Sequence, residues 1–480
     1  MLFLTSAHNS LSQRLWIELG ERGHEIRVCV AATGEAMIAA VSREAPELII
    51  APMLKIAIPE EVWSRHLCLI VHPGIKADRG PSSLDWAIAN GEKSWGVTIL
   101  EAADEFDAGP IWASHEFALG ADAPAKSSLY RGQVTEAAVR GVIEAVARIE
   151  LGEFRSGSWQ PEKLVHVSPQ GSPTLRGCLR PPMRQADRAI DWTRDKTALI
   201  VRKIRAADSA PGVLGTLLGK FCFLYGAHEE ERLNGPPGQV LARRDGAICI
   251  GTIDGAVWIS HLKARAEAQE VISLASPCIG YADLCPAAGI KLPAAQVLGP
   301  LLAGVPEAPL PLDAPAGHRT FREIVYTEED QIGYLSFDFY NGAMSRSQCY
   351  RLRHAFLHAR SRPTRVIVLL GGADFWSNGI DLNAIEACAD PAMESWRNIN
   401  AIDDLIFEIL NTMSHFVIAG LRGNAGAGGA MLALAADHVY ARSGVVLNPH
   451  YRSMGDLYGS EYWTYALPRR VGRKRALELT

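Results

Sequence analysis

A histidine and an aspartate in the first quarter of the sequence are of the types that together move a proton. His72 ends the apolar run LCLIVH, and Asp107 follows in the loop DEFDAGP. An imidazole titrates near neutral pH, and a carboxylate beside it can orient the ring and assist proton transfer. The alternative interpretation of the same sequence pattern is a structural histidine in the core and an unrelated aspartate on a solvated loop. The pair is therefore a candidate acid–base site if the fold brings the two side chains together.

Two glycine-rich turns in the last third of the sequence could bind a developing negative charge. They lie in GGADFWSNGIDLNAI and in GLRGNAGAGGAMLALAADHVYA, each after an apolar run. A glycine turn that leads into a helix lets backbone N–H groups approach an oxyanion, and the helix dipole adds to the attraction. One such turn would be weak evidence, because helix packing also favours small residues. Two in succession indicate a candidate oxyanion site.

A carboxylate among aromatic residues follows these turns. The segment NPHYRSMGDLYGSEYWTYALPRR is dense in tyrosine and contains Glu461. An aromatic pocket would raise the pKa of the Glu461 carboxyl group, so that it could exchange a proton. Tyr451 is the second candidate for this role. An amphipathic surface turn anchored by aromatic side chains is the alternative.

The elements that must position His72 and Asp107 have the pattern of an α/β fold with a parallel sheet. MLFLTS, EIRVCVAA, ELIIAP and LCLIVH are short apolar runs, and residues 10–22 and 135–149 have helical spacing. Apolar strands that alternate with helices are typical of parallel sheets covered on both faces. The end of such a strand, where His72 lies, is where these sheets bind ligands.

The remaining sequence predicts two further domains. SGSWQPEKLVHVSPQGSPTLRG reads as a linker, and the short runs KFCFLYGA, GQVLARR, GAICIGT and AVWISHL predict a small, OB-like β-barrel. Residues 299–317, which are rich in proline, read as a second linker, and α/β character returns with VIVLLGG. We therefore expect an amino-terminal domain at residues 1–156, a linker and barrel at 157–300, and a third domain at 318–480.

Composition and charge exclude several classes of protein. The chain has 480 residues, 48% hydrophobic and 21% charged, which is ordinary for a folded protein and excludes wholesale disorder. A formal net charge of −5 argues against a nucleic-acid-coating protein. No apolar stretch reaches the ~18 residues of a membrane helix, and the first residues lack the pattern of a signal peptide. The nine cysteines are scattered without a CxxC pair, which predicts reduced thiols in the cytoplasm and no metal site.

The phrase LIVHPGIKADRGPSSLDWAIANGEKSWGVTILEAADEFDAGPIW resembles the folate-dependent formyltransferases, especially methionyl-tRNA formyltransferase. The matching positions are His72, Arg79, Gly80, Gly96, Val97, Thr98, Asp107 and Gly109. The resemblance implies 10-formyltetrahydrofolate as the donor, with His72 stabilising the developing oxyanion and Asp107 orienting the ring. It also implies a pterin pocket near Leu54, Lys55, Ile58 and Asp104.

The sequence departs from this family at two places. Ile70 stands where the family has a catalytic asparagine, and an amide donor of that kind contributes about 3–4 kcal/mol in hydrolases. Its loss favours an easier acceptor than an amine, such as the more nucleophilic thiol. The start, TSAHNSLSQR, also differs. There we expect Arg14, with Arg131, to contact a phosphate or pantetheine, the alternative for both being a solvated arginine on a helix face.

The last third of the chain resembles the crotonase (enoyl-CoA hydratase/isomerase) superfamily through its two glycine turns. The resemblance implies that the backbone N–H groups of Ile380 and Gly428 bind a thioester oxygen. The acids of the hydratases fall on Met431 and His450, so ordinary water addition to an enoyl thioester is not expected. The resemblance stops at RVGRKRALELT, before the family's usual end, which indicates a shortened domain or a fragment.

A formyltransferase joined to a crotonase resembles the HypX/HoxX-type maturation factors of nickel–iron hydrogenase. This resemblance implies transfer of a formyl group to coenzyme A, and release of carbon monoxide from formyl-CoA as the hydrogenase ligand. It also implies small-molecule substrates and hydrogenase maturation proteins as candidate partners. The alternatives are formyl transfer to a sugar nucleotide or a tRNA with an accessory crotonase module, and a non-catalytic carrier of formyl-folate or a thioester.

Overall fold

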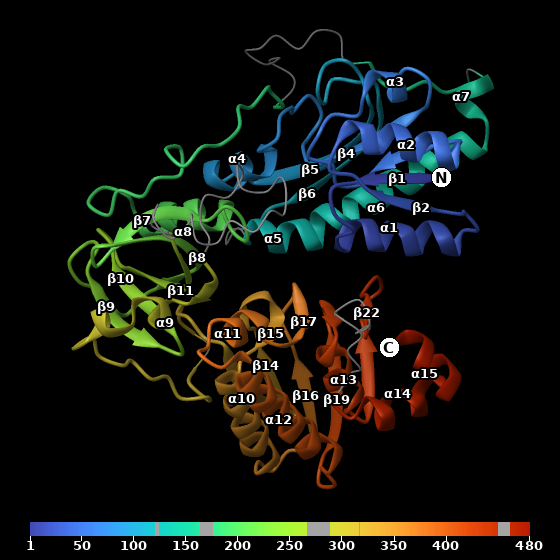
Figure 1. Ribbon diagram of the computed structural model, residues 1–480. Helices are drawn as coiled ribbons and strands as arrows, with labels where there is room; N and C mark the ends of the chain where they lie inside the picture. Colours follow the sequence, from blue (N-terminus) through green and yellow to red (C-terminus); the bar gives the residue numbers. More distant parts are fainter. Residues whose placement is uncertain (121–123, 157, 164–175, 266–288, 316, 450–460) are drawn as a thin grey trace. The chain divides into compact units, whose positions relative to one another are not determined.

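The computed structural model describes residues 1–120, 124–156, 158–163, 176–265, 289–315, 317–449 and 461–480 (Figure 1). The chain divides into two compact units. The first comprises Met1–Ala189 and Arg202–Ala210, and the second Ile190–Val201 and Pro211–Thr480. Among the described residues, no helix is long and apolar enough to cross a membrane.

The first unit contains a six-stranded sheet in the order β2-β1-β3-β4-β5-β6. Its strands are β1 (Leu2–Thr5), β2 (Arg27–Val30), β3 (Ile49–Ala51), β4 (Cys68–His72), β5 (Ser94–Glu101) and β6 (Ile111–Ala118). The first four are parallel, β5 pairs antiparallel with β4, and β6 pairs antiparallel with β5. The parallel sheet expected from the apolar runs is thus confirmed, with an antiparallel extension.

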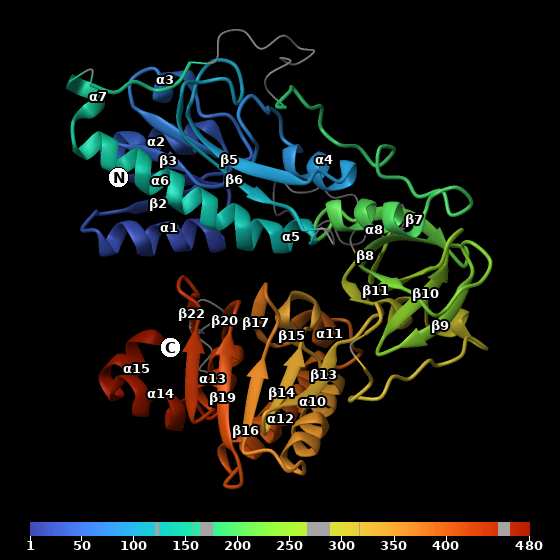
Figure 2. The ribbon, with the colours of Figure 1, turned by 180° about the vertical axis from the view of Figure 1, so that it is seen from behind.

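Helices cover both faces of this sheet (Figures 1 and 2). The helical segments are α1 (Ser10–Glu21), α2 (Gly34–Glu44), α3 (Glu60–Trp63), α4 (Ser83–Asn90), α5 (Lys126–Leu129), a π-helical turn (Tyr130–Val134), α6 (Thr135–Glu150) and α7 (Glu153–Ser156). Successive side chains of a strand point to opposite faces. Phe3 accordingly packs in a core with α1, α4 and α6, whereas Leu2 and Leu4 pack in a second core with α2 and α3.

Parts of the segment expected as the first linker pack on the first unit. Glu162 exchanges two backbone hydrogen bonds with Ile111 at the start of β6, at 2.8 and 2.9 Å. Leu179 forms a parallel bridge with Arg79. Most of the polar middle of this segment, residues 164–175, lies outside the described residues.

The second unit begins with an antiparallel sheet in the order β7-β8-β11-β10-β9, with β12 paired to β11. This is the small β domain expected from the sequence. Its strands are β7 (Val213–Leu217), β8 (Lys220–Glu230), β9 (Val240–Arg244), β10 (Ala247–Gly251), β11 (Ala256–Ala264) and β12 (Lys291–Pro293). Its helices are α9 (Ala294–Leu298) and the 3-10 turn η2 (Gly299–Leu302), and α8 (Thr197–Ala206) is divided between the two units. The second expected linker is not free chain, because Arg243 of β9 exchanges backbone hydrogen bonds with Pro306 and Ala308.

The rest of the second unit is the α/β domain that carries the two glycine turns. Its main sheet has the order β13-β14-β16-β19-β21, and a smaller sheet has the order β17-β20-β22. The strands are β13 (Ile324–Glu329), β14 (Ile332–Phe337), β15 (Ala343–Met344), β16 (Val366–Leu370), β17 (Phe375–Ser377), β18 (Gly379–Ile380), β19 (Phe416–Leu421), β20 (Asn424–Gly426), β21 (His438–Ala441) and β22 (Leu447–Asn448). The helical segments are η3 (Tyr340–Gly342), α10 (Arg346–Arg360), α11 (Leu382–Glu386), α12 (Pro391–Leu410), α13 (Gly428–Leu434), α14 (Trp463–Val471) and α15 (Arg473–Leu479).

Candidate active site

His72 lies at the end of β4, and its side chain is 4% exposed. The neighbouring strand β5 fixes the loop that follows. Thr98 Oγ1 donates a hydrogen bond to the Gly74 carbonyl at 2.9 Å, and Trp95 Nε1 donates to the Pro73 carbonyl at 3.0 Å. Both donors lie on β5, the strand that carries the formyltransferase-like GVT motif. This strand therefore holds the loop that follows His72.

Asp107 meets His72 in the fold. The distance from His72 Nδ1 to Asp107 Oδ1 is 3.4 Å. The backbone N–H of Gly80 donates to Asp107 Oδ2 at 3.1 Å, so the Arg-Gly motif holds this carboxylate. A Cβ atom on Gly109 would lie 2.0 Å from the Glu101 carbonyl oxygen, which explains the glycine two residues after the aspartate. The structure thus brings together the two residues predicted as an acid–base pair.

Asp78 is a second carboxylate beside His72, which the sequence interpretation missed. Its Oδ2 lies 3.7 Å from His72 Nε2, and its side chain is fully buried. Asp78 accepts hydrogen bonds from the Ser83 hydroxyl and from Arg180 Nε. Burial raises the pKa of Asp78, but the His72 imidazole, the Ser83 hydroxyl and the Arg180 guanidinium outweigh this effect and hold the pKa below its usual value. Its position directly before the Arg-Gly motif is the only local signal in the sequence.

The residues expected to line a pterin pocket lie on two loops, one after β3 and one between β5 and β6. Leu54 and the buried Ile58 pack with Ile70 on one face of the sheet. Side chains two apart on a strand share a face, so His72 belongs to the same face as Ile70. The backbone N–H of Lys55 donates to Ser6 Oγ at 2.9 Å, and Asp104 is exposed on the loop that carries Asp107. Their contact with a pterin remains a prediction.

Arg14 and Arg131 lie on neighbouring elements of the first unit. The Arg14 guanidinium pairs with Glu18 at 2.7 Å on α1 and lies 3.8 Å from Glu136 on α6. Arg131 belongs to the π-helical turn that precedes α6. Arg14 is only 11% exposed, so it is not the solvated arginine of the alternative interpretation. Contact of either side chain with a phosphate remains a prediction.

In the second unit, the two glycine turns lie against each other. Ile380 ends the short strand β18, and Gly428 begins α13. A Cβ atom on Gly379 would lie 3.1 Å from the backbone nitrogen of Gly428. The N–H groups predicted to bind one oxyanion therefore come from adjoining stretches of backbone.

Glu461 reaches the same turn from the far end of the chain. A Cβ atom on Gly428 would lie 2.4 Å from Glu461 Oε1, and Glu461 is 4% exposed. Burial raises the pKa of the Cys349 thiol to about 12, and the Glu461 charge adds to this shift. Tyr451 and His450 lie outside the described residues. Met431, where the hydratases have an acid, is fully buried in α13 against Leu467.

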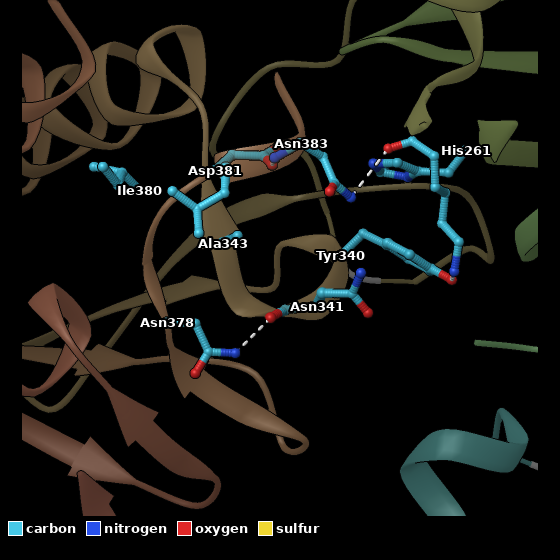
Figure 3. A pocket seen from close by; sticks show the side chains of 10 residues that line it. His261, Tyr340, Asn341, Ala343, Asn378, Ile380, Asp381 and Asn383 are labelled. Atoms are coloured by element: carbon cyan, nitrogen blue, oxygen red, sulfur yellow. Dashed lines mark hydrogen bonds between the residues drawn. The ribbon is translucent and has the colours of Figure 1, made fainter. Parts of the chain in front are cut away.

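A cavity of about 210 Å³ adjoins Ile380 (Figure 3). Residues from distant parts of the second unit line it, among them His261, Lys291, Tyr340, Asn341, Asn378 and Asn383. Asn378 donates to the Asn341 carbonyl at 2.7 Å, and Asn383 donates to the Lys291 carbonyl at 3.3 Å. Sequence reasoning missed His261, Lys291 and Tyr340 because they lie far from the glycine turns in the chain. Asn378 and Asn383 flank Ile380 within the first of these turns, but nothing in its pattern marks their amides as cavity lining.

One end of the cavity is aromatic and carries a single ammonium group. The His261 ring stacks on Tyr340 with centroids 4.3 Å apart. Lys291 Nζ lies 3.9 Å from the Tyr225 ring centroid and donates to the Tyr340 hydroxyl at 3.1 Å. Burial and the Lys291 charge lower the pKa of His261 to about 3, so its ring is neutral.

In the part of the chain that the structure describes, no cluster of three or more His, Cys, Asp or Glu side chains could hold a metal ion.

Three family models match the chain in the order expected from the motifs. Residues 27–146 match the formyl transferase model, residues 182–276 its C-terminal domain, and residues 338–480 the enoyl-CoA hydratase/isomerase model. Hydrogenase maturation factor HoxX of Bradyrhizobium diazoefficiens is 46% identical over 480 residues, which is 100% of this chain and 78% of that protein. The chain belongs to the HypX/HoxX family of hydrogenase maturation factors.

Solved structures of this family have the same fold. HypX from Aquifex aeolicus in complex with tetrahydrofolic acid matches with a TM-score of 0.90 at 48% identity, covering 100% of this chain and 78% of that one. Methionyl-tRNA formyltransferase of Thermotoga neapolitana is 31% identical over 222 residues, 45% of this chain and 66% of that protein. The resemblances to formyltransferases and to crotonases, and the α/β fold class, are confirmed.

Proposed function

We propose that this enzyme transfers the formyl group of 10-formyltetrahydrofolate to coenzyme A and then releases carbon monoxide from formyl-CoA. Carbon monoxide would serve as the ligand of nickel–iron hydrogenase, handed on by maturation proteins in the cytoplasm. Membership of the HypX/HoxX family and the tetrahydrofolate complex of a relative support the folate and maturation parts. The observation that carries the first reaction is the His72–Asp107 pair at 3.4 Å.

In the first reaction, the thiol sulfur attacks the formyl carbon and the bond from that carbon to the folate nitrogen breaks. The thiol proton ends on the released nitrogen, so the step needs no other reactant. His72, oriented by Asp107, stabilises the oxyanion and carries this proton. Ile70 supplies no amide to help, and a thiol needs less activation than an amine.

In the second reaction, formyl-CoA separates into carbon monoxide and free coenzyme A. The carbon–sulfur bond breaks, and the formyl hydrogen leaves as a proton that the thiolate regains. The backbone N–H groups of Ile380 and Gly428 hold the thioester oxygen. Glu461, which lies against the Gly428 turn, accepts and returns the proton. Tyr451 is the second candidate for this transfer.

The cavity beside Ile380 supports coenzyme A as the acceptor. Pantetheine presents amide groups, and the cavity offers the amides of Asn341, Asn378 and Asn383 together with the Lys291 ammonium. Arg14 and Arg131 remain the residues proposed to contact its phosphate or pantetheine portion in the first unit.

The test supplies the full-length chain with isotope-labelled 10-formyltetrahydrofolate and coenzyme A. We expect labelled carbon monoxide, detected by its binding to haemoglobin, and a loss of about 100-fold or more in His72→Ala. Equal carbon monoxide from the parent and from His72→Ala would overturn the proposal.

The carrier alternative draws on two observations, the apolar Ile70 and the buried Met431 in place of catalytic groups. A carrier would bind formyl-folate without consuming it. Stoichiometric binding with no release of tetrahydrofolate over repeated additions of coenzyme A would favour the carrier. Formyl transfer to a sugar nucleotide or a tRNA, but not to coenzyme A, would identify the other acceptors.

A further inference from the structure

His72 has a carboxylate on each side of its ring. Asp107 faces Nδ1 at 3.4 Å, and Asp78 faces Nε2 at 3.7 Å. Nε2 is buried, and no described residue forms a hydrogen bond with it. A buried polar atom left in this way costs free energy unless a nearby charge compensates. The Asp78 carboxylate is the charge in that position.

Asp78 is itself held firmly from two directions. The Ser83 hydroxyl donates to Oδ2, and Arg180 Nε donates to Oδ1 at 2.5 Å. Ser83 Oγ also lies 3.1 Å from the Pro73 carbonyl oxygen, in the loop that follows His72. The carboxylate is therefore fixed in place before any substrate binds.

The backbone around Arg180 fixes the other partner. Arg180 N–H donates to the Arg79 carbonyl at 2.8 Å, and Arg79 N–H donates to the Cys178 carbonyl at 3.1 Å. A Cβ atom on Gly80 would lie 2.2 Å from the Arg180 carbonyl oxygen, so only glycine admits this approach. The segment that brings Arg180 to Asp78 thus lies directly along the Arg-Gly motif.

We propose that Asp78 is a positioning residue for formyl transfer, which holds the Nε2 side of His72 so that the ring exchanges its proton through Nδ1. A carboxylate only accepts hydrogen bonds, so it favours a proton on the nitrogen that faces it. Asp107 has the same effect at Nδ1, but Nε2 and Asp78 are buried whereas Asp107 is 15% exposed, so the Nδ1 proton is the one exchanged. This inference rests on the proposed formyl transfer.

The residue two positions before His72, Ile70, is apolar and cannot orient the ring. Formyltransferases of the resembling family have an amide at this position, whereas the Ile70 side chain has no polar atom to orient the reacting groups. Ile70 packs against an apolar cluster, and charges act more strongly where water is excluded. Asp78 therefore orients the His72 ring from its Nε2 side. A polar residue at position 70 could have taken part in this role, but Ile70 cannot.

The direct test compares Asp78→Asn with Asp85→Asn. Both are buried, ion-paired aspartates of the first unit, but Asp85 pairs with Lys126 and Arg188. We expect Asp78→Asn to lower kcat for formyl transfer about 10- to 100-fold, part of what general acid–base catalysis contributes, and to leave the KM for the folate within about twofold. Asp85→Asn should keep kcat within about twofold of the parent.

A spectroscopic readout separates positioning from loss of structure. In ¹⁵N-histidine-labelled protein, with His72→Gln to assign the signals, Nε2 of His72 should resonate as a protonated nitrogen. In Asp78→Asn, whose amide can donate to Nε2, this signal should move toward that of an unprotonated nitrogen. Unchanged His72 signals, or an unchanged kcat, would overturn the inference.

A second variant covers the case in which Asp78→Asn does not fold. Arg180→Gln keeps the Asp78 carboxylate but removes the guanidinium that fixes its position, so a smaller change of the His72 signals and a smaller fall in kcat are expected. No change in either quantity would also overturn the inference. If the parent transfers no formyl group, the proposed function fails, whereas the His72 signals still decide whether Asp78 sets the proton position.

Discussion

His72 and His261 are both buried histidines, yet their neighbours give them different uses. Carboxylates face both ring nitrogens of His72. His261 stacks on Tyr340 and is kept neutral by burial and by the Lys291 charge, which lower its pKa to about 3. This contrast supports the proton transfer that we propose for His72, whereas His261 forms part of the cavity wall.

The neutral state of His261 predicts how stability depends on pH. An unfolded histidine binds a proton near pH 6.5, whereas folded His261 binds one only near pH 3. The unfolded state therefore binds more protons between these values, and stability falls as the pH drops below about 6.5. His261→Phe should make this slope shallower by about 1.4 kcal/mol per pH unit.

Native-state hydrogen exchange in β11, compared at about pH 6.5 and about pH 5, measures this slope. The exposed His354, replaced by Gln, is the control. A slope in His261→Phe equal to that of the parent would show that folded His261 is already charged at these pH values.

At the scale of elements, the turn between β5 and β6 decides where Asp107 lies. Asp107 has a left-handed backbone conformation with φ of 54°. Gly109, two residues later, fits against the Glu101 carbonyl with no room for a side chain. The Asp107 carboxylate, for which we propose a catalytic role, is thus placed by the path of the backbone and by the hydrogen bond that it accepts from the Gly80 N–H.

Gly109→Ala should therefore displace the turn. The added Cβ atom would meet the Glu101 carbonyl oxygen at 2.0 Å, and such overpacking costs about 1–3 kcal/mol. We expect formyl transfer to fall at least about tenfold, because small displacements of catalytic groups lower rates strongly. Gly120→Ala, where a Cβ atom meets nothing within 4 Å, should change neither the melting temperature nor the rate. An active, equally stable Gly109→Ala would contradict this role of the turn.

The sequence predicted the strands that are continuous apolar runs and the helices near residues 10–22 and 135–149, because apolar runs and helical spacing are local signals. It did not predict that β5 runs antiparallel to both of its neighbours, β4 and β6, since strand direction depends on partners that the pattern does not show. The His72–Asp107 pair was predicted because a family motif contains both residues. Asp78 and Lys291 were missed because their partners, Arg180 and Tyr340, lie far away in the chain.

At the scale of the whole molecule, the two proposed reactions belong to different compact units. His72 and Asp107 lie in the first unit, and Glu461 and Gly428 lie in the second. A formyl thioester made by the first reaction would hydrolyse in bulk water, so a protected route to the second reaction would preserve it. Separate units also mean that a change in one site need not affect the other.

Glu461→Gln tests this separation. The amide keeps the shape of the side chain but cannot accept the formyl proton, so carbon monoxide release should fall about 100-fold or more while formyl-CoA still forms. Chromatography of formyl-CoA and haemoglobin trapping of carbon monoxide measure the two steps. The exposed Glu478, replaced by Gln, is the control. Loss of both steps in a folded protein would show that Glu461 is structural.

Because the boundary between the two units falls within α8, the gene cannot be divided simply into two fragments that each encode one unit. Ile190–Val201 belongs to the second unit, whereas Arg202–Ala210 returns to the first. No single cut in the gene therefore yields both units whole. A shortened gene that stops after α7 would also omit Arg180, the partner of Asp78. Neither unit is therefore encoded by one continuous piece of the gene. A recombination that replaces one unit must keep the segment from Cys178 to Ala210 together with the residues of both units that it contacts.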